Sequence, residues 1–309
     1  MSKLDKIEEL QNLLKEDPQD SQLRRELAVL LIDMGFNDEA LQNLLYLSKT
    51  NSNDEGIFYN LGIVYEKMKN FKKAKEMYLK ALEIKPEYTD ATYNLGLVYT
   101  ELKEYLPAID CFKEVLNEDS NDSNTYFSLG LAYFKNKDYL NAIENFQKTI
   151  DINDEDLYAH FYIANIYKEF GDNEAAKAEF EKVLTISPDY SWAYFNLASI
   201  YNEEGNLELA KENLIKTIEM NPKDREAYSI LTKLYLKEKS YENAAKTITD
   251  CLNECDPTGD TCYLAAMAYK PLDKEEYISY LSNAIKHYQS LSRPVQAVKD
   301  ELNNARDWD

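Results

Sequence analysis

Apolar positions along the chain recur with a spacing of 34 residues. The segment from Asn60 to Tyr65 reads NLGIVY, and the segment from Asn94 to Tyr99 reads NLGLVY. The same step continues in both directions without an insertion, which defines eight repeats. Their first residues are Ser21, Glu55, Thr89, Ser123, Leu157, Ser191, Arg225 and Gly259. A fixed period of this length predicts a row of similar structural units.

Each repeat holds two apolar sets, and each set predicts one helix. The first set has the form Leu-Gly-x-x-Tyr, as in Leu61 to Tyr65. The second set has a spacing of four and then three, as in Ala74, Tyr78 and Ala81, which marks one face of a helix. In the last repeat Tyr277 begins the second set one residue early, so we expect a shorter turn there.

Glycine and proline separate the two helices of a repeat and close it. Glycine at the fifteenth place of a repeat predicts a helix end in the left-handed conformation. Glycine or alanine at the eighth place predicts the close approach of a second helix. Proline at the thirty-second place predicts the end of the second helix. These residues are Gly35, Gly171 and Gly205, then Gly62, Gly96 and Gly130, then Pro18, Pro86, Pro188 and Pro222.

Over residues 21 to about 290 the chain resembles the tetratricopeptide repeat family. The resemblance lies in Leu-Gly-x-x-Tyr on the first helix, in alanine, an aromatic residue and alanine on the second, and in the closing proline. The resemblance implies an all-α, right-handed superhelical solenoid of antiparallel helix pairs. First helices would line a concave groove and second helices would form the outside. Ser120 and Asp154 replace the closing proline, and the repeat from Ser21 to Asp54 lacks the glycine and the tyrosine.

Both ends of the repeat array are expected to carry capping helices, because a terminal repeat would otherwise expose an apolar face. We expect an N-terminal capping helix in residues 1–20, the solenoid in 21–292, and a C-terminal capping helix with a tail in 293–309. Asn303 to Asp309 is polar apart from Trp308 and is expected to fray.

Composition supports a helical chain and narrows the class of partner. With 44% hydrophobic residues but only eight glycines and eight prolines, disorder and a many-stranded β fold are both disfavoured. The net charge of −21 disfavours nucleic acid and anionic membranes as partners. No apolar leader or spanning segment is evident, so a cytoplasmic location is expected. Frequent lysine, asparagine and tyrosine indicate a bacterial source.

Residues suited to catalysis or metal binding are sparse. His160 occupies a packing position, the fourth place of its repeat, and His287 is the only other histidine. Cys251, Cys255 and Cys262 lack the paired spacing of zinc sites, and Cys251 and Cys262 fall on core-facing places. No glycine-rich phosphate loop or hydrolase motif occurs. We therefore expect no enzyme activity, no metal and no cofactor.

The groove predicted by the resemblance is rich in aromatic and amide side chains. An amide can donate to and accept from the backbone of an extended peptide, and aromatic rings can anchor its side chains. The aromatic residues at the fifth place could instead serve packing between first helices. The predicted groove residues are Tyr59, Asn60, Ile63, Tyr93, Asn94, Leu97, Phe127, Phe134, Tyr158, Phe161, Tyr162, Asn165, Trp192, Phe195 and Asn196.

Charge in the groove argues against one known ligand class. A branch of the family holds the terminal carboxylates of chaperone tails with lysine or arginine, but here Asp90 and Asn124 stand at the second place, Tyr59 at the fifth and Ser128 at the sixth. Chaperone-tail binding is therefore disfavoured. Acidic groove places such as Asp90 and Glu101 favour a neutral or basic protein partner.

Taken together, the sequence predicts a non-enzymatic scaffold or adaptor that binds a peptide segment of another protein, extended or helical, in its groove. Two alternatives remain open. One is a homo-oligomeric structural module in which the last repeat and the C-terminal cap pair two chains through Leu264, Met267 and the following helix. The other is an accessory targeting subunit of an enzyme encoded elsewhere.

Overall fold

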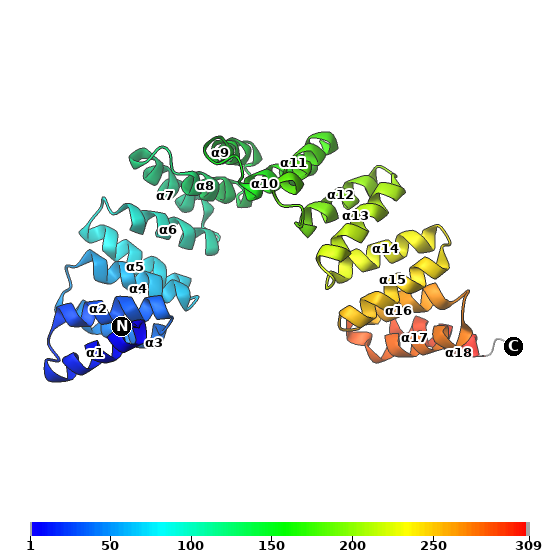
Figure 1. The fold of residues 1–309 in the computed structure, drawn as a ribbon, viewed down its shortest axis with the longest axis horizontal. Helices are drawn as coiled ribbons and strands as arrows, with labels where there is room; N and C mark the ends of the chain where they lie inside the picture. The colour runs from blue at the N-terminus through cyan, green and yellow to red at the C-terminus, as the bar shows by residue number, and fades with distance from the viewer. Residues whose placement is uncertain (1, 307–309) are drawn as a thin grey trace. The chain divides into compact units, whose positions relative to one another are not determined.

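The computed structural model describes residues 2–306, and these form helices with no strand. Consecutive helices lie side by side as antiparallel pairs (Figure 1). The predicted all-α solenoid class is therefore confirmed. The helices are α1 (Lys3–Glu16), α2 (Ser21–Met34), α3 (Asn37–Thr50), α4 (Glu55–Lys67), α5 (Phe71–Ile84), α6 (Thr89–Glu101), α7 (Tyr105–Glu118), α8 (Ser123–Lys135), α9 (Tyr139–Ile152), α10 (Leu157–Glu169), α11 (Asn173–Ile186), α12 (Ser191–Glu203), α13 (Leu207–Met220), α14 (Arg225–Lys237), α15 (Tyr241–Glu254), α16 (Gly259–Tyr269), α17 (Lys274–Lys286), the short 3-10 helix η1 (Tyr288–Ser290) and α18 (Val295–Arg306).

The helix starts follow the 34-residue numbering of the sequence. The first helix of each repeat, from α2 to α16 in even numbers, begins at the residue where that repeat begins. The second helix begins at the seventeenth place in seven repeats, but α17 begins at Lys274, the sixteenth place of the last repeat. The early second helix is confirmed, but the expectation of a shorter turn is wrong, because α16 already ends at Tyr269 and four residues, 270–273, separate it from α17.

Glycine at the eighth place lets the two helices of a pair approach closely. A Cβ at Gly96 would lie 2.7 Å from Cε1 of Phe112, and one at Gly130 would lie 2.8 Å from Cδ1 of Phe146. Both rings are fully buried. The close approach predicted at this place is confirmed, and it seats an aromatic ring of the second helix against the backbone of the first.

The turn between paired helices uses a left-handed residue at the fifteenth place. Gly35, Gly171 and Gly205 have φ between 76° and 79°, as predicted. Lysine takes the same conformation in four of the other five repeats, which the sequence did not indicate: Lys69, Lys103, Lys137 and Lys239 have φ between 57° and 63°. In α6 the turn is closed by Lys103 N–H donating to the Thr100 carbonyl at 3.1 Å and Glu104 N–H donating to the Tyr99 carbonyl at 2.8 Å.

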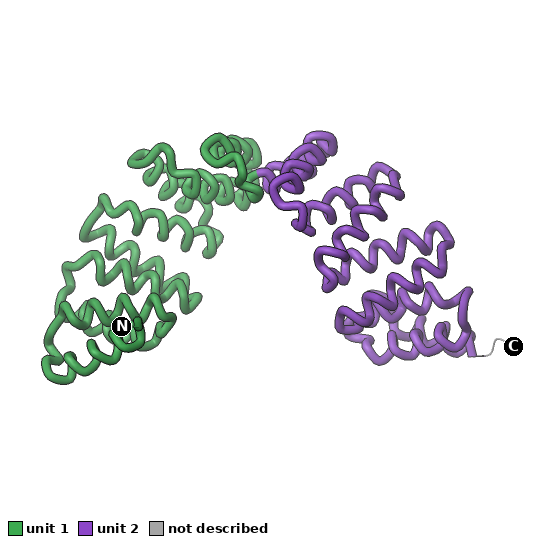
Figure 2. Tube along the Cα trace, viewed as in Figure 1, with its two compact units in different colours: residues 1–159 green, residues 160–309 purple. Residues whose placement is uncertain are grey.

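The chain forms two compact units, residues 1–159 and 160–309 (Figure 2). In the first unit α1 packs on α2 and buries Ile7, Leu10 and Leu14. In the second unit α18 packs on α17 and buries Val298, Leu302 and Ala305.

The expectation of a frayed segment from Asn303 is wrong for Asn303 to Arg306. These residues continue α18, because Ala305 lies on the same helix face as Val298 and Leu302 and is only 1% exposed. Trp308 lies outside the described residues.

Candidate functional site

The aromatic residues at the fifth place of the repeats pack on a second aromatic ring and remain half-buried. In four repeats the fifth-place residue contacts a buried ring on the second helix of the same repeat. The ring-centroid distances are 5.9 Å for Tyr59 and Tyr78, 5.7 Å for Tyr93 and Phe112, 5.5 Å for Phe127 and Phe146, and 5.9 Å for Phe161 and Phe180. These predicted groove residues therefore support the helix pair while presenting part of their surface to solvent.

Three of the four predicted groove asparagines already make hydrogen bonds within the chain. Asn94 Nδ2 donates to the Tyr59 hydroxyl at 3.3 Å, and Asn165 Nδ2 donates to the Phe161 carbonyl at 2.7 Å. Asn196 Nδ2 donates to the Trp192 carbonyl at 2.9 Å. Asn60 is half-buried on α4. Each bonded amide uses one of its two N–H groups in this way, so hydrogen-bonding capacity is left on the first helices.

Trp192 is the most exposed of the predicted aromatic anchors. Its side chain is 56% exposed at the start of α12, and its ring stands edge-on to Phe195 with the centroids 6.3 Å apart. In the first unit Tyr158 is 54% exposed near the start of α10. Large apolar rings that a fold leaves exposed are candidates for contact with a partner.

The remaining predicted residues, Ile63, Leu97, Phe134 and Tyr162, are half-buried on first helices. The Phe134 ring lies 5.7 Å from that of Tyr139, and burial raises the pKa of Tyr162. Leu97 lines an open depression of about 370 Å³ together with Leu131 of α8 and Phe71 of α5. The structure thus brings Leu97 to a hollowed part of the first unit.

A second depression in the first unit, the first-helix pocket, has a volume of about 250 Å³. It is lined by Tyr59, Asp90, Tyr93, Asn94, Asp122 and Asn124, with Thr89 and Val115 at its margin. Burial, with a smaller contribution from the Asp90 carboxylate, raises the pKa of the Tyr59 phenol. The structure therefore joins three predicted groove residues to two aspartates.

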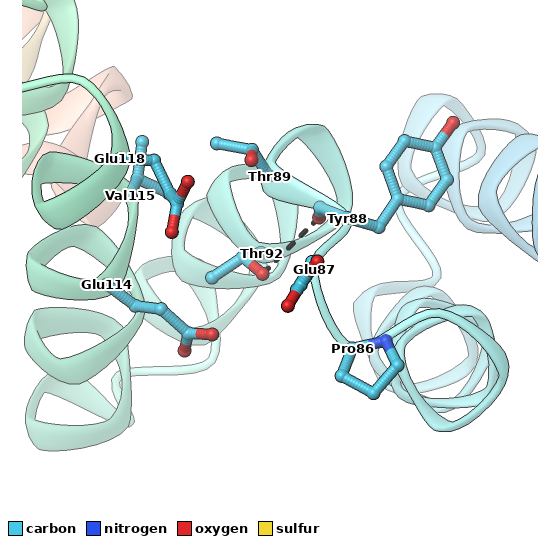
Figure 3. Close-up of a pocket in the computed structure, with 8 residues that line it drawn as sticks. All are labelled: Pro86, Glu87, Tyr88, Thr89, Thr92, Glu114, Val115 and Glu118. Atoms are coloured by element: carbon cyan, nitrogen blue, oxygen red, sulfur yellow. Dashed lines mark hydrogen bonds between the residues drawn. The ribbon is translucent and has the colours of Figure 1, made fainter.

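Sequence reasoning missed a smaller cavity next to it, the edge pocket, of about 40 Å³. Glu87 on the loop before α6 and Glu114 and Glu118 on α7 point toward Thr92, while the Tyr88 ring points away (Figure 3). Thr92 is buried and its hydroxyl donates to the Tyr88 carbonyl at 3.4 Å. A signal existed in the sequence, since Thr92 and Glu114 depart from what other repeats carry at the same places.

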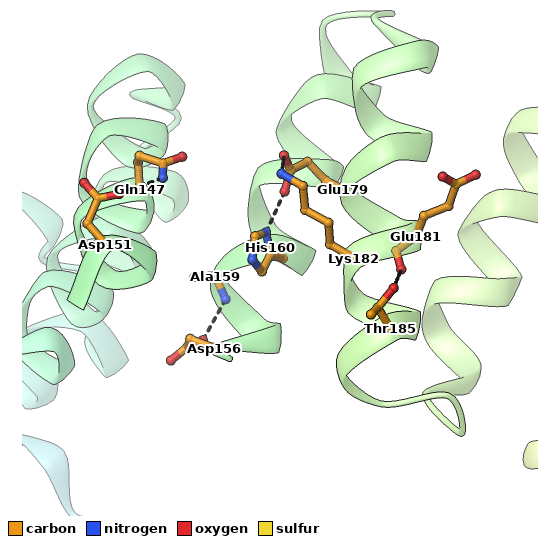
Figure 4. A network of polar contacts seen from close by, with 9 residues as sticks. All are labelled: Gln147, Asp151, Asp156, Ala159, His160, Glu179, Glu181, Lys182 and Thr185. Carbon is orange, nitrogen blue, oxygen red and sulfur yellow. Dashed lines mark hydrogen bonds and ion pairs between the residues drawn. The ribbon is translucent and has the colours of Figure 1, made fainter. Parts of the chain in front are cut away.

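His160 and the cysteines lie where packing, not catalysis, explains them. His160 is 5% exposed, its Nδ1 lies 2.6 Å from Glu179 Oε2, and Lys182 donates to the other oxygen of that carboxylate (Figure 4). The prediction of a core histidine is confirmed. Cys251 and Cys262 are buried, also as predicted, and burial raises the pKa of the Cys251 thiol to about 12.

Within residues 2–306 no three histidine, cysteine or acidic side chains are placed to hold a metal ion. In the same part of the chain, no helix has the length and apolar character that crossing a bilayer requires.

Comparison with known proteins points to one family. Family models described as tetratricopeptide repeat match residues 57–88, 89–122 and 123–156, and 169–234, which together make up more than half of the chain. No curated protein matched.

Solved structures with similar folds include the following two. MamA 41-end from Desulfovibrio magneticus RS-1 is 25% identical, with 56% of this chain and 97% of that chain aligned and a TM-score of 0.54. The C-terminal part of a TPR repeat-containing protein from Cytophaga hutchinsonii is 19% identical, with 72% of this chain and 91% of that chain aligned and a TM-score of 0.60. At that identity the second likeness shows the fold alone.

Proposed function

Because the chain belongs to the tetratricopeptide repeat family, whose members are in general non-enzymatic protein-interaction modules, we propose that it binds a segment of a partner protein on the surface of its first helices. The first-helix surface is defined here by the residues predicted for the groove in each unit. The chain itself then acts as a scaffold and catalyses no reaction.

Exposure of Trp192 carries this proposal. An indole that is 56% exposed beside the half-buried Phe195 offers a partner a large apolar contact at one place. Aromatic residues of this kind account for much of the binding free energy in protein interfaces, and truncating a good anchor costs about 2 kcal/mol or more. An exposure of 56% shows that Trp192 is not a core residue of its unit.

The polar groups beside Trp192 support binding to a polypeptide backbone. Lys168 Nζ on α10 donates to Asn196 Oδ1 and to Ser199 Oγ, each at 3.2 Å, which fixes the orientation of the Asn196 amide. Asn196 also donates to the Trp192 carbonyl and is itself only 9% exposed, so the half-buried Lys168 and Ser199, rather than the Asn196 amide, present polar groups to a partner. This arrangement suits an extended segment that passes along the first helices.

The proposal is tested by comparing two truncations in one unit. Trp192→Ala removes an exposed side chain from a first helix, and Ile215→Ala removes a side chain that is 39% exposed from the second helix α13. The full chain and both variants are used to capture proteins from an extract of the source organism, followed by quantitative mass spectrometry. Proteins that wild type and Ile215→Ala retain but Trp192→Ala loses, with unchanged circular dichroism, are the expected result.

Equal capture by all three proteins, or loss with Ile215→Ala alone, contradicts binding on the first-helix surface. A partner found in this way is then mapped by shortening it to the segment that still binds.

Self-association is the second candidate that the sequence suggested. Leu264 and Met267 are half-buried and pack against core clusters of their own unit, which leaves little of their surface for a second copy. We therefore favour a different protein as the partner. Light scattering that gives the monomer mass across a wide concentration range agrees with this choice, and a dimer mass argues against it.

We further propose that α1 and α18 act as caps for a scaffold that works in the cytoplasm of a bacterium. Both helices bury an apolar face against the neighbouring helix and present charged residues outward, which keeps the end of a repeat array from associating.

A further inference from the structure

In four of the eight repeats, the fourth place on the first helix and the twenty-sixth place on the second helix hold a cation over an aromatic ring. The ammonium-to-centroid distances are 5.7 Å for Lys80 and Phe58, 5.5 Å for Lys148 and Tyr126, and 5.5 Å for Lys216 and Tyr194. In the repeat that begins at Ser21 the roles are exchanged, and Arg24 lies 4.0 Å from the Tyr46 ring centroid. This edge of the repeat is therefore built to accommodate a positive charge.

The repeat that begins at Thr89 has neither the ring nor the cation. Thr92 stands at the fourth place and Glu114 at the twenty-sixth. A further change lies one helical turn on, where Glu118 stands at a place that four other repeats fill with an apolar residue, namely Ile84, Ile152, Ile186 or Met220. The smaller side chain at Thr92 opens the edge pocket, and the two glutamates reverse its charge.

The edge pocket is lined by three carboxylates, those of Glu87, Glu114 and Glu118, and by no lysine or arginine (Figure 3). Within residues 2–306, no ion pair neutralises any of the three. A volume of about 40 Å³ is enough for one ammonium group, which is close in size to a water molecule. The cavity thus has the size and the charge for the cation that the neighbouring repeats supply from their own side chains.

The first-helix pocket continues this negative surface, because the two pockets share Thr89 and Val115 at their common margin. It adds the carboxylates of Asp90 and Asp122 and the half-buried rings of Tyr59 and Tyr93. No lysine or arginine lines this pocket either. Its volume of about 250 Å³ leaves room for a whole basic side chain beside the rings.

We propose that the two pockets together bind a basic stretch of the partner segment, with a lysine in the edge pocket and a second lysine or an arginine in the first-helix pocket. This inference rests on the proposed function and names the chemistry of the segment that the first unit selects. The partner supplies the two cations, because the repeat that begins at Thr89 lacks the cation that four other repeats carry at this edge.

Recognition at each pocket uses different groups. In the edge pocket the carboxylates of Glu114 and Glu118 accept hydrogen bonds from the ammonium group, and such charge-assisted bonds are the stronger ones in proteins. In the first-helix pocket Asp90 provides the negative charge while the faces of Tyr59 and Tyr93 attract the cation. The overall charge of −21 adds long-range attraction for a basic segment.

The test is a selection from a displayed library of short random peptides on the immobilised full chain. Selections on three variants run in parallel. Thr92→Tyr with Glu114→Lys rebuilds the ring and cation of the neighbouring repeats, and Asp90→Asn removes one exposed charge without changing side-chain size. Glu181→Lys on α11, an exposed glutamate of the second unit, matches the charge change of Glu114→Lys away from both pockets.

Enrichment of lysine or arginine at two fixed positions is expected on wild type and on Glu181→Lys. On the rebuilt double variant the enrichment at one position should disappear, and a peptide selected on wild type should bind both it and Asp90→Asn about tenfold more weakly. That peptide should also lose affinity as salt is raised. Unchanged circular dichroism and melting of Asp90→Asn exclude misfolding as the cause.

Three results overturn the inference. Peptides selected on wild type without basic enrichment contradict it while leaving the proposed function in place. Equal weakening by Glu181→Lys shows that net charge, and not the two pockets, governs binding. If wild type enriches no peptide at all while Trp192→Ala changes no captured protein, the proposed function fails together with the inference.

Discussion

The backbone of Gly96 on α6 touches the ring of Phe112 on α7, so that a Cβ at Gly96 would lie 2.7 Å from Cε1 and 2.9 Å from Cζ of that ring. Phe112 is fully buried and cannot move aside without displacing its neighbours. The pair therefore sets how closely the two helices of this repeat pack.

Gly96→Ala should lower the free energy of unfolding by about 1–3 kcal/mol, the usual cost of an added carbon in a filled core. Urea unfolding followed by circular dichroism measures the loss. Gly96→Ala combined with Phe112→Leu copies the pair Ala198 and Leu214 of another repeat and should recover part of the stability. If Gly96→Ala alone were as stable as wild type, the two helices could move apart without a loss in the free energy of unfolding.

Lys103 holds a left-handed conformation with φ of 62° at the end of α6, where three other repeats use glycine. A side chain with a Cβ is strained there, whereas glycine is not. Lys103→Gly should therefore raise the free energy of unfolding by about 0.5–1 kcal/mol, measured by thermal unfolding. Lys103→Ala keeps the Cβ and should give no such gain, so an equal gain in both variants would point away from backbone strain.

Asp54 links two repeats, because its carboxylate accepts hydrogen bonds from both terminal nitrogens of Arg25 on α2 and also caps the start of α4 through Ile57 N–H. The hydrogen bonds from Arg25 hold the pKa of Asp54 below its ordinary value of 3.8. A carboxyl with a lowered pKa stabilises the fold above the pKa of the unfolded chain, and this stabilisation is lost as pH falls through the folded value.

Asp54→Asn should thus lower the stability at neutral pH by about 1 kcal/mol, a partly exposed pair being weaker than a buried one. The difference from wild type should shrink as pH falls below 3.8, measured by urea unfolding at a series of pH values. Arg25→Gln should give a similar loss at neutral pH, and the double variant should lose little more than either one. A difference that stays constant down to acidic pH contradicts the charged pair as its source.

Much of the fold could be predicted because the same packing inside each repeat imposes the repeat pattern. The eighth-place glycines and the second-helix aromatics follow from contacts inside one helix pair, and such contacts recur wherever the residues recur. The helical continuation of Asn303 to Arg306 escaped prediction because only Ala305 in that stretch is buried, and one alanine among polar residues gives no visible period.

The candidate site was predictable only in part. Which residues lie on first helices follows from their place in the repeat, so Tyr59, Tyr93 and Asn94 were found. The hydrogen bond from Asn94 to Tyr59 joins two repeats, and its geometry depends on how those repeats stack. The edge pocket depends on the same stacking and on the absence of a ring at Thr92, which a search for conspicuous residues passes over.

The sequence by itself determined the helix pairs, their 34-residue period and the residues on the buried face of each helix. These follow from local spacing and from side-chain size. Only the tertiary structure decided which groove residues are exposed and which carboxylates share a cavity. Exposure and shared cavities depend on atoms from several helices at once, so Trp192 on α12 and Glu114 on α7 acquire their significance from neighbours that no local pattern specifies.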